Sequence, residues 1–368
     1  MEQWKEYRLG EICNRVCSGG TPSSRHDEYY GGNIPWLNTK EVDFKPIYYT
    51  EKNITQEGLV NSSAKWIEKN SIVVAMYGAT AGKTAITKIP LTTNQACCNL
   101  TINPDVADYR FVYYFLAHKF NELASLANGG AQQNLNAQII KDFVIRLPKI
   151  SLQKNIANIL SALDDKIENN HKINKNLLEQ AQAIYTKRFI TDADSLWPEG
   201  KLSDIIEVCY GKDHKKLHDG DIPVYGSGGI IRHVDRALYE QESVLVPRIG
   251  TLNNVMYVDE PFWSVNTMFF TKMKRQNVAK FVFHFLKGKD LASMNAGSAV
   301  PSMTTKILNA IPLQIPDDQT LSTFEAQVSP FYQAASYNNK EFENLAAIRD
   351  SLLPKLMSGE IDVSGLDL

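Results

Sequence analysis

The segment 78–84, which reads Gly-Ala-Thr-Ala-Gly-Lys-Thr, comes nearest in residue types and spacing to a known catalytic loop. A glycine-rich loop that follows a strand and ends in Lys-Thr can cradle the phosphates of a nucleotide. That motif requires four residues between its two glycines, whereas this segment has three, and Tyr77 stands where the first glycine belongs. The segment therefore predicts contact of Lys83 and Thr84 with a phosphate more strongly than it predicts nucleotide hydrolysis.

Other patterns that could support catalysis are incomplete. The segment 103–105 (Asn-Pro-Asp) lacks the second proline and the aromatic residue of an amino-methyltransferase motif. The segment 199–201 (Glu-Gly-Lys) lacks the upstream Pro-Asp of a nuclease site. The seven histidines contain no HExxH pair, and the five cysteines contain no CxxC pair or zinc-ligand spacing. We therefore expect no catalytic residues, no metal site and no cofactor in this chain.

Composition places the chain among ordinary globular proteins. Its 368 residues are enough for two domains, and it is 43% hydrophobic and 22% charged. No run approaches the roughly 18 apolar residues of a membrane span, and the first residues lack the pattern of a signal peptide. The odd number of cysteines suits reduced thiols, so we expect a cytoplasmic protein with no membrane partner. The net charge of −2 does not exclude nucleic-acid binding, since charge can be segregated to one face.

Glycine-containing loops rich in Asn, Gln, Ser, Arg and Lys are the remaining candidates for a functional surface. They lie at 18–24, 128–134 and 225–229. Such side chains contact base edges and phosphates of DNA, although each one alone is equally compatible with a solvated turn. In the first half of the chain we select as DNA contacts Ser23, Arg25, Lys40, Tyr77, Lys83, Thr84, Gln132, Gln133 and Asn134. In the second half we select Lys212, His214, Lys215, Ser227, Arg248, Asn253, Asn254 and Ser298.

These loops belong to two similar halves of the chain. The first half opens with Trp4 and the segment 9–12, and the second opens with Trp197 and the segment 202–205. Further matches, in order, are 34–36 with 222–224, 71–74 with 243–246, Gly78 with Gly250, Asn94 with Asn266, and 111–116 with 281–286. The offset falls from 193 to 168 residues, mostly before Ser243, so the second half is shorter. Because the order is kept throughout, we interpret the halves as an internal repeat rather than as chance similarity.

A long amphipathic helix is predicted at the end of each half. Apolar residues and asparagines recur at spacings of three and four between 149 and 190, which indicates a heptad seam with one stutter. The first seam is Leu152, Ile156, Ile159, Leu163, Ile167, Asn170, Asn174, Leu177, Ala181 and Ile184. The second is Phe324, Val328, Phe331, Ala335, Phe342, Leu345, Ile348 and Leu352. Pro354 should kink or end the second helix, and Ser358-Gly359 is a stop signal.

Helices of this length, about 60 Å at 1.5 Å per residue, need a partner to bury their apolar faces. We expect the two to form an antiparallel coiled coil with one globular module at each end, related by a pseudo-two-fold axis. The alternative is that each helix packs separately on its own module. Asn170, His171 and Asn174, at the polar centre of the first helix, could set the register of the pair, lie in solvent or dock another subunit.

The globular modules are predicted to mix short strands with helices. We expect strands at 71–77, 98–102, 243–249 and 268–272, and helices at 107–126 and 278–286. The predicted fold is α+β, with two α/β domains at 1–148 and 194–316. A central long helix at 149–193 and a C-terminal long helix and tail at 317–368 complete the chain.

Several short motifs, in a fixed order, resemble one family. They are Trp4 with 9–12, the loop 19–23 (Gly-Gly-Thr-Pro-Ser), 34–36 (Ile-Pro-Trp), Gly78, 94–95 (Asn-Gln) and 134–136 (Asn-Leu-Asn). Together with the duplication, they resemble the specificity (S) subunits of type I restriction–modification systems over the whole chain. The second half departs from the pattern at 211–213 (Gly-Lys-Asp) and 301–303 (Pro-Ser-Met), so residue-level transfer there is weaker.

The resemblance implies a non-catalytic reader of double-stranded DNA. Each recognition domain would read one half of a bipartite, asymmetric target in the major groove. The helices would fix the gap between the halves and dock two methyltransferase (M) subunits, which restriction (R) subunits would join. S-adenosylmethionine, ATP and magnesium would then belong to those partners and not to this chain.

Three other functions remain open from the sequence. The chain could be the specificity subunit of another two-domain modification system. It could be a nucleotide-dependent enzyme that uses 78–84, or a coiled-coil adaptor that binds only protein.

Overall fold

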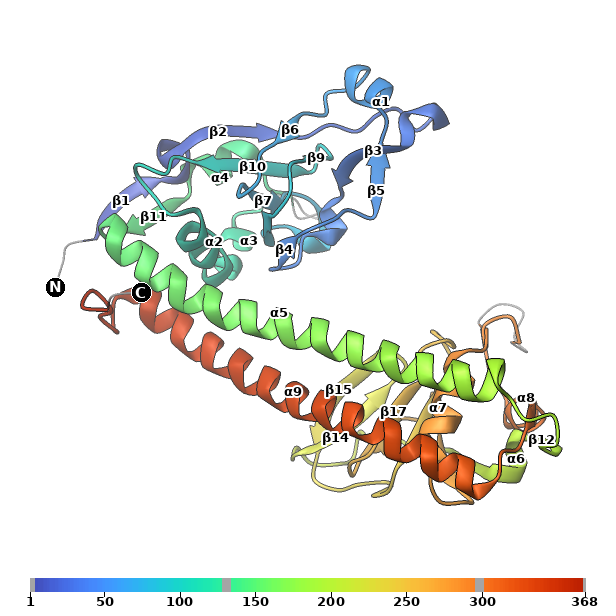
Figure 1. Ribbon diagram of the computed structural model, residues 1–368. Coiled ribbons are helices and arrows are strands. Elements are labelled where there is room, and N and C mark those ends of the chain that lie inside the picture. Colours follow the sequence, from blue (N-terminus) through green and yellow to red (C-terminus); the bar gives the residue numbers. More distant parts are fainter. Residues whose placement is uncertain (1–3, 128–133, 295–300, 367–368) are drawn as a thin grey trace. The chain divides into compact units, whose positions relative to one another are not determined.

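The computed structural model describes residues 4–127, 134–294 and 301–366, and the chain divides into two compact units (Figure 1). The first unit comprises Met1–Asn169 together with Lys340–Leu368, and the second comprises Asn170–Asn339. Each unit combines mainly antiparallel sheets with segments of two long helices, so the fold is α+β. No helix within the described ranges has the length and apolar character that crossing a lipid bilayer requires.

The first unit is built around a five-stranded sheet with the order β2-β10-β7-β8-β4. Its central strand β7 reads Ile-Val-Val-Ala and is wholly buried, which suits a strand covered on both faces. A four-stranded sheet, β5-β3-β9-β6, and the pair β1-β11 lie beside it. The strands are β1 Lys5–Arg8, β2 Cys13–Ser18, β3 Tyr30–Leu37, β4 Pro46–Ile47, β5 Lys52–Ile54, β6 Trp66–Ile67, β7 Ile72–Ala75, β8 Thr84–Thr87, β9 Leu91–Thr93, β10 Cys97–Ile102 and β11 Val144–Leu147.

Short helices complete the first unit, namely α1 Gln56–Val60, α2 Tyr109–His118, α3 Phe120–Ser125 and α4 Ala137–Asp142. Asp108 begins α2 by accepting hydrogen bonds from the amides of Arg110 and Phe111. The prediction of one helix over 107–126 is wrong, because the chain leaves helical geometry at Lys119 and restarts as α3. The buried run of α2 packs into the core of the unit.

The second unit is also built of mainly antiparallel sheets, with fewer strands among its described residues. Its sheets have the orders β13-β19-β16-β17, β15-β14-β18 and β12-β20. The strands are β12 Glu199–Lys201, β13 Ile206–Tyr210, β14 Ile222–Gly226, β15 Gly229–Val234, β16 Ser243–Pro247, β17 Met256–Val258, β18 Trp263–Ser264, β19 Met268–Met273 and β20 Pro312–Gln314. The helices are α6 Leu202–Ile205, α7 Ala279–Lys287 and α8 Thr305–Asn309. The strands predicted at 71–77 and 243–249 are each shorter at their C-terminal end than expected.

Backbone hydrogen bonds show which positions of the two units correspond. The Asn94 amide donates to the Leu37 oxygen in the first unit, and the Val265 amide donates to the Tyr225 oxygen in the second, both at 3.0 Å. Asn94 therefore corresponds to Val265. The predicted match of Asn94 with Asn266 is off by one residue.

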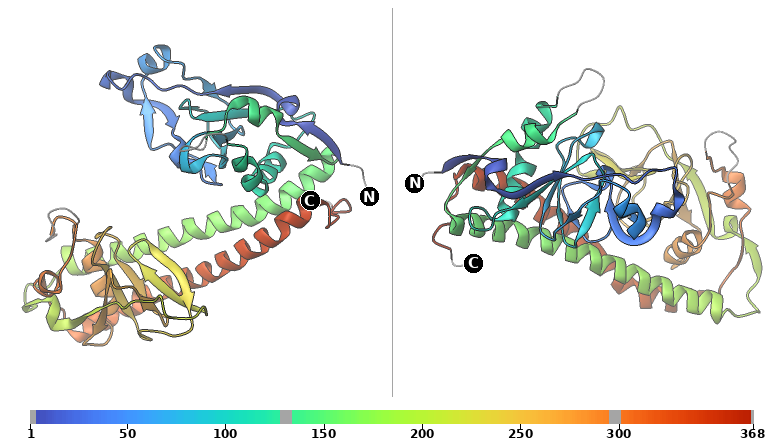
Figure 2. Two further views of the ribbon diagram at one scale, coloured as in Figure 1. Left: turned by 180° about the vertical axis from the view of Figure 1, so that it is seen from behind. Right: turned by 90° about the horizontal axis from the view of Figure 1, so that it is seen from above.

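The two long helices are α5 (Ile150–Thr186, 37 residues) and α9 (Asp318–Ser358, 41 residues). Within the first unit the early part of α5 runs beside the late part of α9 in the opposite direction (Figures 1 and 2), and Arg349 donates to Asp164 at 2.8 Å. Within the second unit the late part of α5 meets the early part of α9, and Asn174 donates to the Ala335 oxygen at 3.2 Å. In each unit the helices therefore contact one another as well as their own module, contrary to the alternative of separate packing.

The ends of the long helices differ from the prediction. A π-helical turn, Lys187–Thr191, follows α5. Helix α9 does not end at Pro354 but continues to Ser358, because Leu356 and Met357 beyond the proline are buried in the core of the first unit. Gly359 then ends the helix with φ +76°, as the Ser-Gly signal predicts. Ile348 was expected in the seam but is 48% exposed.

Candidate nucleic-acid interface

The first loop, residues 20–26, overlaps the predicted loop 18–24 and leaves the central sheet through two glycines, Gly19 and Gly20, packed against backbone. A Cβ atom on Gly19 would lie 2.1 Å from the Thr93 carbonyl oxygen, and one on Gly20 would lie 2.2 Å from the Ala64 nitrogen. No side chain tolerates such distances, so the chain can take this path only with glycine. The Gly20 amide donates to the same Thr93 oxygen at 2.8 Å, which fixes the start of the loop.

Two aromatic side chains hold the carbonyl groups of this first loop. The buried Trp36 indole, on β3, donates to the Gly20 oxygen at 2.9 Å. The Tyr30 hydroxyl donates to the Pro22 oxygen at 2.6 Å, and burial raises the pKa of this tyrosine. The rings of Tyr30 and Trp36 also meet edge to face, with centroids 6.0 Å apart. The backbone from which Ser23 and Arg25 project is therefore held by side-chain donors.

A second loop, residues 212–217, was not among the loops expected from the sequence, although it holds the selected residues Lys212, His214 and Lys215. It leaves the corresponding sheet of the second unit in the same way. A Cβ atom on Gly211 would lie 2.0 Å from a backbone oxygen. The Trp263 indole donates to the carbonyl oxygen of Lys212, the first residue of the loop, at 3.0 Å. The Arg232 guanidinium donates to the carbonyl oxygen of the last residue at 3.2 Å. Both ends of this loop are held by side chains from outside it.

The turn that follows β7 corrects the expectation of a phosphate-binding loop. Residues 78–84 connect β7 to the antiparallel strand β8, whereas a nucleotide cradle leads into a helix. Thr84 lies in β8 and its side chain is fully buried, so it is not available to DNA. Lys83 forms an ion pair with Asp43 at 2.6 Å. The geometry therefore contradicts the hypothesis of a nucleotide-dependent enzyme that uses 78–84. The prediction that Thr84 contacts DNA was also wrong.

Each unit joins the turn after its central strand to the segment before its last short helix, α4 or α8. An isolated bridge pairs Tyr77 with Asn134 in the first unit, and another pairs Ile249 with Ser302 in the second. Tyr77 is 44% exposed. The Leu135 amide donates to the Met76 oxygen and the Met303 amide donates to the Arg248 oxygen, both at 2.8 Å, so the two bridges occupy equivalent positions. Asn134 therefore corresponds to Ser302, one residue later than the sequence match of 134–136 with 301–303, and each unit has a second exposed edge here.

The second unit gathers several predicted contacts around this turn. The Arg248 guanidinium lies over the Tyr210 ring, 5.4 Å from its centroid. Asn254 donates to the Ser227 carbonyl oxygen at 2.8 Å. Asn253 is committed to Asp290, to which its amide group donates at 3.1 Å. The structure thus brings Ser227 and Asn254 together, and places Arg248 on Tyr210, through contacts that spacing alone did not show.

Apart from the buried Thr84, the described contact candidates fall into two groups by accessibility. Exposed side chains are Ser23, Arg25, Lys40, Tyr77, Asn134, Lys212, Lys215 and Asn253, and partly exposed ones are Lys83, His214, Ser227, Arg248 and Asn254. Lys40 is paired with Glu51 at 2.6 Å, which raises the pKa of the lysine. The Nδ1 atom of His214 is buried. Gln132, Gln133 and Ser298 lie outside the described residues.

The polar centre of α5 is turned toward α9 within the second unit. Asn170 is 2% exposed and donates to the Asn338 oxygen at 3.5 Å, and Asn174 is bonded to Asn339 at 2.8 Å. His171 is exposed. The expectation that Asn170 docks another subunit was therefore wrong, because its side chain is buried. Asn170 and Asn174 instead make contacts that suit setting the register of α5 against α9.

No catalytic or metal-binding arrangement emerges from the part of the chain that the structure describes. Within those residues, no three His, Cys, Asp or Glu side chains converge on a metal position. Burial raises the pKa of the Cys13 and Cys98 thiols to about 12, so neither supplies a thiolate at neutral pH. The residues that sequence reasoning missed are the anchors Trp36, Tyr30, Trp263 and Arg232. Only Trp36 had a signal, as part of the Ile-Pro-Trp motif.

Comparison with known proteins decides the family. The model of the type I restriction modification DNA specificity domain matches residues 1–179 and 194–329. The chain belongs to this family. It is 26% identical to the type I restriction enzyme MjaIX specificity subunit of Methanocaldococcus jannaschii, over 99% of this chain and 95% of that protein. It is 29% identical to the EcoR124I/EcoR124II specificity subunit of Escherichia coli, over 44% of this chain and 41% of that protein.

A solved S subunit shares the fold. The type I restriction–modification S subunit from M. genitalium superimposes with a TM-score of 0.65 at 21% identity, covering 96% of both chains. As a specificity subunit, the chain is a DNA-recognition component and not itself an enzyme.

Proposed function

We propose that this specificity subunit reads a bipartite, asymmetric DNA target, one half with each unit. The observation that supports this is the pair of anchored loops 20–26 and 212–217. Each loop follows the strand that pairs with β10 or β19, so both occupy the same place in their units. Their side chains differ, with Ser23 and Arg25 in one and Lys212 and Lys215 in the other. Because different donors and acceptors select different bases, the two halves of the target should differ.

We further propose that α5 and α9 form an antiparallel coiled coil that sets the distance between the half-sites. At 1.5 Å per residue a helix the length of α5 reaches about 55 Å, more than the roughly 34 Å of one DNA turn. Two methyltransferase subunits would dock on these helices, and restriction subunits would join that core in the cytoplasm. Exposed α5 residues such as His171 and Ile173 suit docking better than the buried Asn170. A pseudo-two-fold relation of the domains at 1–148 and 194–316 would place both readers on one side of the duplex.

A domain exchange tests this proposal. Residues 1–148 are replaced by those of a relative with a different target, and the chimera is co-expressed with its cognate methyltransferase subunits. We expect one half of the methylated sequence to change while the other half and the gap stay the same. Single-molecule sequencing of the host DNA reads the methylated bases. A chimera that changes both halves, or neither, would refute reading by separate units.

A further inference from the structure

One hydrogen bond occurs in both units although its donor occupies different sequence positions. In the first unit an indole N–H reaches the carbonyl of Gly20, and in the second an indole N–H reaches the carbonyl of Lys212. Gly20 and Lys212 are equivalent, because the Gly20 amide donates to Thr93 and the Lys212 amide donates to Ser264, both at 2.8 Å. The same loop carbonyl is therefore held by a tryptophan in each unit.

The two tryptophans come from opposite members of one strand pair. In the first unit β3 and β9 are parallel and Trp36 pairs with Thr92. In the second unit β14 and β18 are parallel and Val224 pairs with Trp263. Trp36 thus corresponds to Val224, and Thr92 corresponds to Trp263. The tryptophan lies on β3 in the first unit and on β18, the equivalent of β9, in the second. Its indole nevertheless donates to the equivalent loop carbonyl in both units.

Core packing alone does not account for this exchange. A large side chain could fill the space from either strand without directing a donor at one particular oxygen. Both indoles are nearly buried, with Trp36 4% and Trp263 8% exposed, and both donate to the first residue of an exposed loop. A second donor holds each loop further along, the Tyr30 hydroxyl in one unit and the Arg232 guanidinium in the other.

We infer that Trp36 and Trp263 are positioning residues that hold the loops 20–26 and 212–217 in the conformation that reads DNA. The inference rests on the proposed function, since it assigns the loops to the two half-sites. Fixing the first carbonyl of a loop before binding lowers the ordering cost that binding would otherwise carry. It also keeps the exposed side chains in one geometry, which discrimination between bases requires.

The test is substitution of each tryptophan by phenylalanine, which keeps an aromatic ring but removes the indole donor. The full chain is co-expressed with its cognate methyltransferase subunits, and methylation at matched and singly mismatched sites is counted across the host DNA. For Trp36→Phe we expect discrimination in one half of the target to fall roughly tenfold, with the other half unchanged. For Trp263→Phe we expect the opposite half to relax by a similar factor.

Trp197→Phe is the matched control. Its indole donates to the Asp317 carboxylate at 3.3 Å, away from both loops, so both halves should keep wild-type discrimination. Melting temperature and recovery of the assembled complex are measured for each variant. If Trp36→Phe fails to fold, Tyr30→Phe carries the test for the first loop, because it removes only the hydroxyl that holds Pro22.

A transplant gives the sharpest result. Trp36→Val combined with Thr92→Trp moves the indole to the strand that carries it in the second unit, and should restore discrimination that Trp36→Val alone loses. Folded phenylalanine variants with both half-sites unchanged, or with both relaxed equally, would overturn the inference. A wild-type complex that methylates no bipartite sequence would instead refute the proposed function, so the two failures are distinguishable.

Discussion

The junctions where α2 and α7 meet the long helices occupy the same place in the two units but use different polar chemistry. In the first unit Tyr114 donates to Asp164 at 2.6 Å, and Arg349 donates to the other oxygen of that carboxylate at 2.8 Å. In the second unit the corresponding position is His284, held between Gln182 and Tyr332 at 2.8 Å each. A charged contact in one unit is thus a neutral contact in the other.

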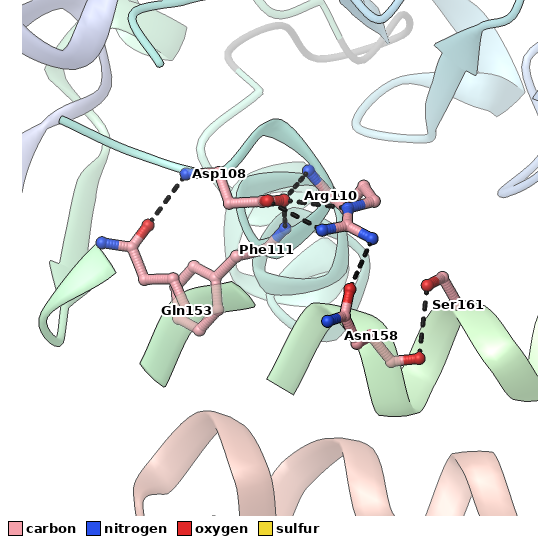
Figure 3. Close-up of polar contacts among 6 residues, drawn as sticks. All are labelled: Asp108, Arg110, Phe111, Gln153, Asn158 and Ser161. Atoms are coloured by element: carbon pink, nitrogen blue, oxygen red, sulfur yellow. Dashed lines mark hydrogen bonds and ion pairs between the residues drawn. The ribbon is translucent and has the colours of Figure 1, made fainter. Parts of the chain in front are cut away.

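One turn earlier the chemistry is reversed. Arg110 is neutralised by Asp108 of its own helix cap and reaches α5 only through the neutral Asn158 (Figure 3). Lys280, at the corresponding position of α7, crosses to Glu325 of α9 at 2.5 Å. Each junction therefore has one contact to a carboxylate of a long helix, Asp164 or Glu325, and one neutral contact, at exchanged positions. The buried polar groups of each junction need hydrogen-bond or ion-pair partners. The residues that provide those partners differ between the two units.

The largest predicted effect is at the ion pair of the second junction. Lys280→Met should destabilise the chain by about 3–5 kcal/mol, because it leaves Glu325 buried without a cation. Urea unfolding of the full chain measures the change. The double variant Lys280→Met with Glu325→Leu should recover most of the loss. A single variant that costs less than about 1 kcal/mol would show that this crossing is not a structural element of the junction.

An effect of about 3 kcal/mol is predicted for acid conditions, through His284. Burial lowers its pKa from 6.5 to about 4. The unfolded chain therefore binds more protons than the folded chain between those values. Stability is fully present above pH 6.5 and falls as the pH decreases toward 4, by about 3 kcal/mol in total.

Hydrogen exchange can locate this acid effect. Peptides of the second unit around α7 should lose protection between pH 6.5 and 4 before those around α2, where Tyr114 takes the place of the histidine. His284→Gln removes the titrating group and should flatten the difference between the units. Equal loss of protection in both units, or a pH response that survives in His284→Gln, would assign the acid sensitivity elsewhere.

The smallest of the three effects is predicted at the charged contact of the first junction. The side chains of Asp164 and Arg349 are 25% and 30% exposed, so water partly replaces a lost partner. Asp164→Asn should therefore cost about 1–2 kcal/mol. A double-mutant cycle with Arg349→Met measures the coupling directly. If Asp164→Asn destabilised the chain as much as Lys280→Met, water would be excluded from both ion pairs equally. That result would contradict the difference in their side-chain exposure.

The sequence showed the plan of the molecule more clearly than its contacts. The ordered matches and the recurring apolar residues of α5 predicted two modules and two long helices, because periodicity and repetition are local properties of a chain. The prediction that Pro354 ends the second helix failed because it used only this local signal. The burial of Leu356 and Met357 outweighs the tendency of proline to end a helix. Lys119, where α2 ends, carried no such local signal.

The candidate interface was harder to predict because exposure and partners depend on tertiary packing. Thr84 and Lys83 are neighbours in a suggestive motif, yet one is buried in β8 and the other is paired with Asp43. The anchoring role of Trp263 could not be foreseen, since its equivalent in the first half is Thr92 and the two share no residue type. A residue-by-residue match of the halves does not reveal that the tryptophan lies on different strands in the two units. The hydrogen bonds show it.

The division of the first unit into two chain segments has a consequence for how the protein is made. Residues 340–368 supply Leu356, Met357 and Val363 to the core of the first unit, yet they are synthesised after the whole of the second unit. During translation, the first unit cannot complete its core until residues 340–368 have been synthesised. The second unit is continuous in sequence and can fold before then. A chain released before residue 340 would therefore leave incomplete the core of the unit that had been translated first.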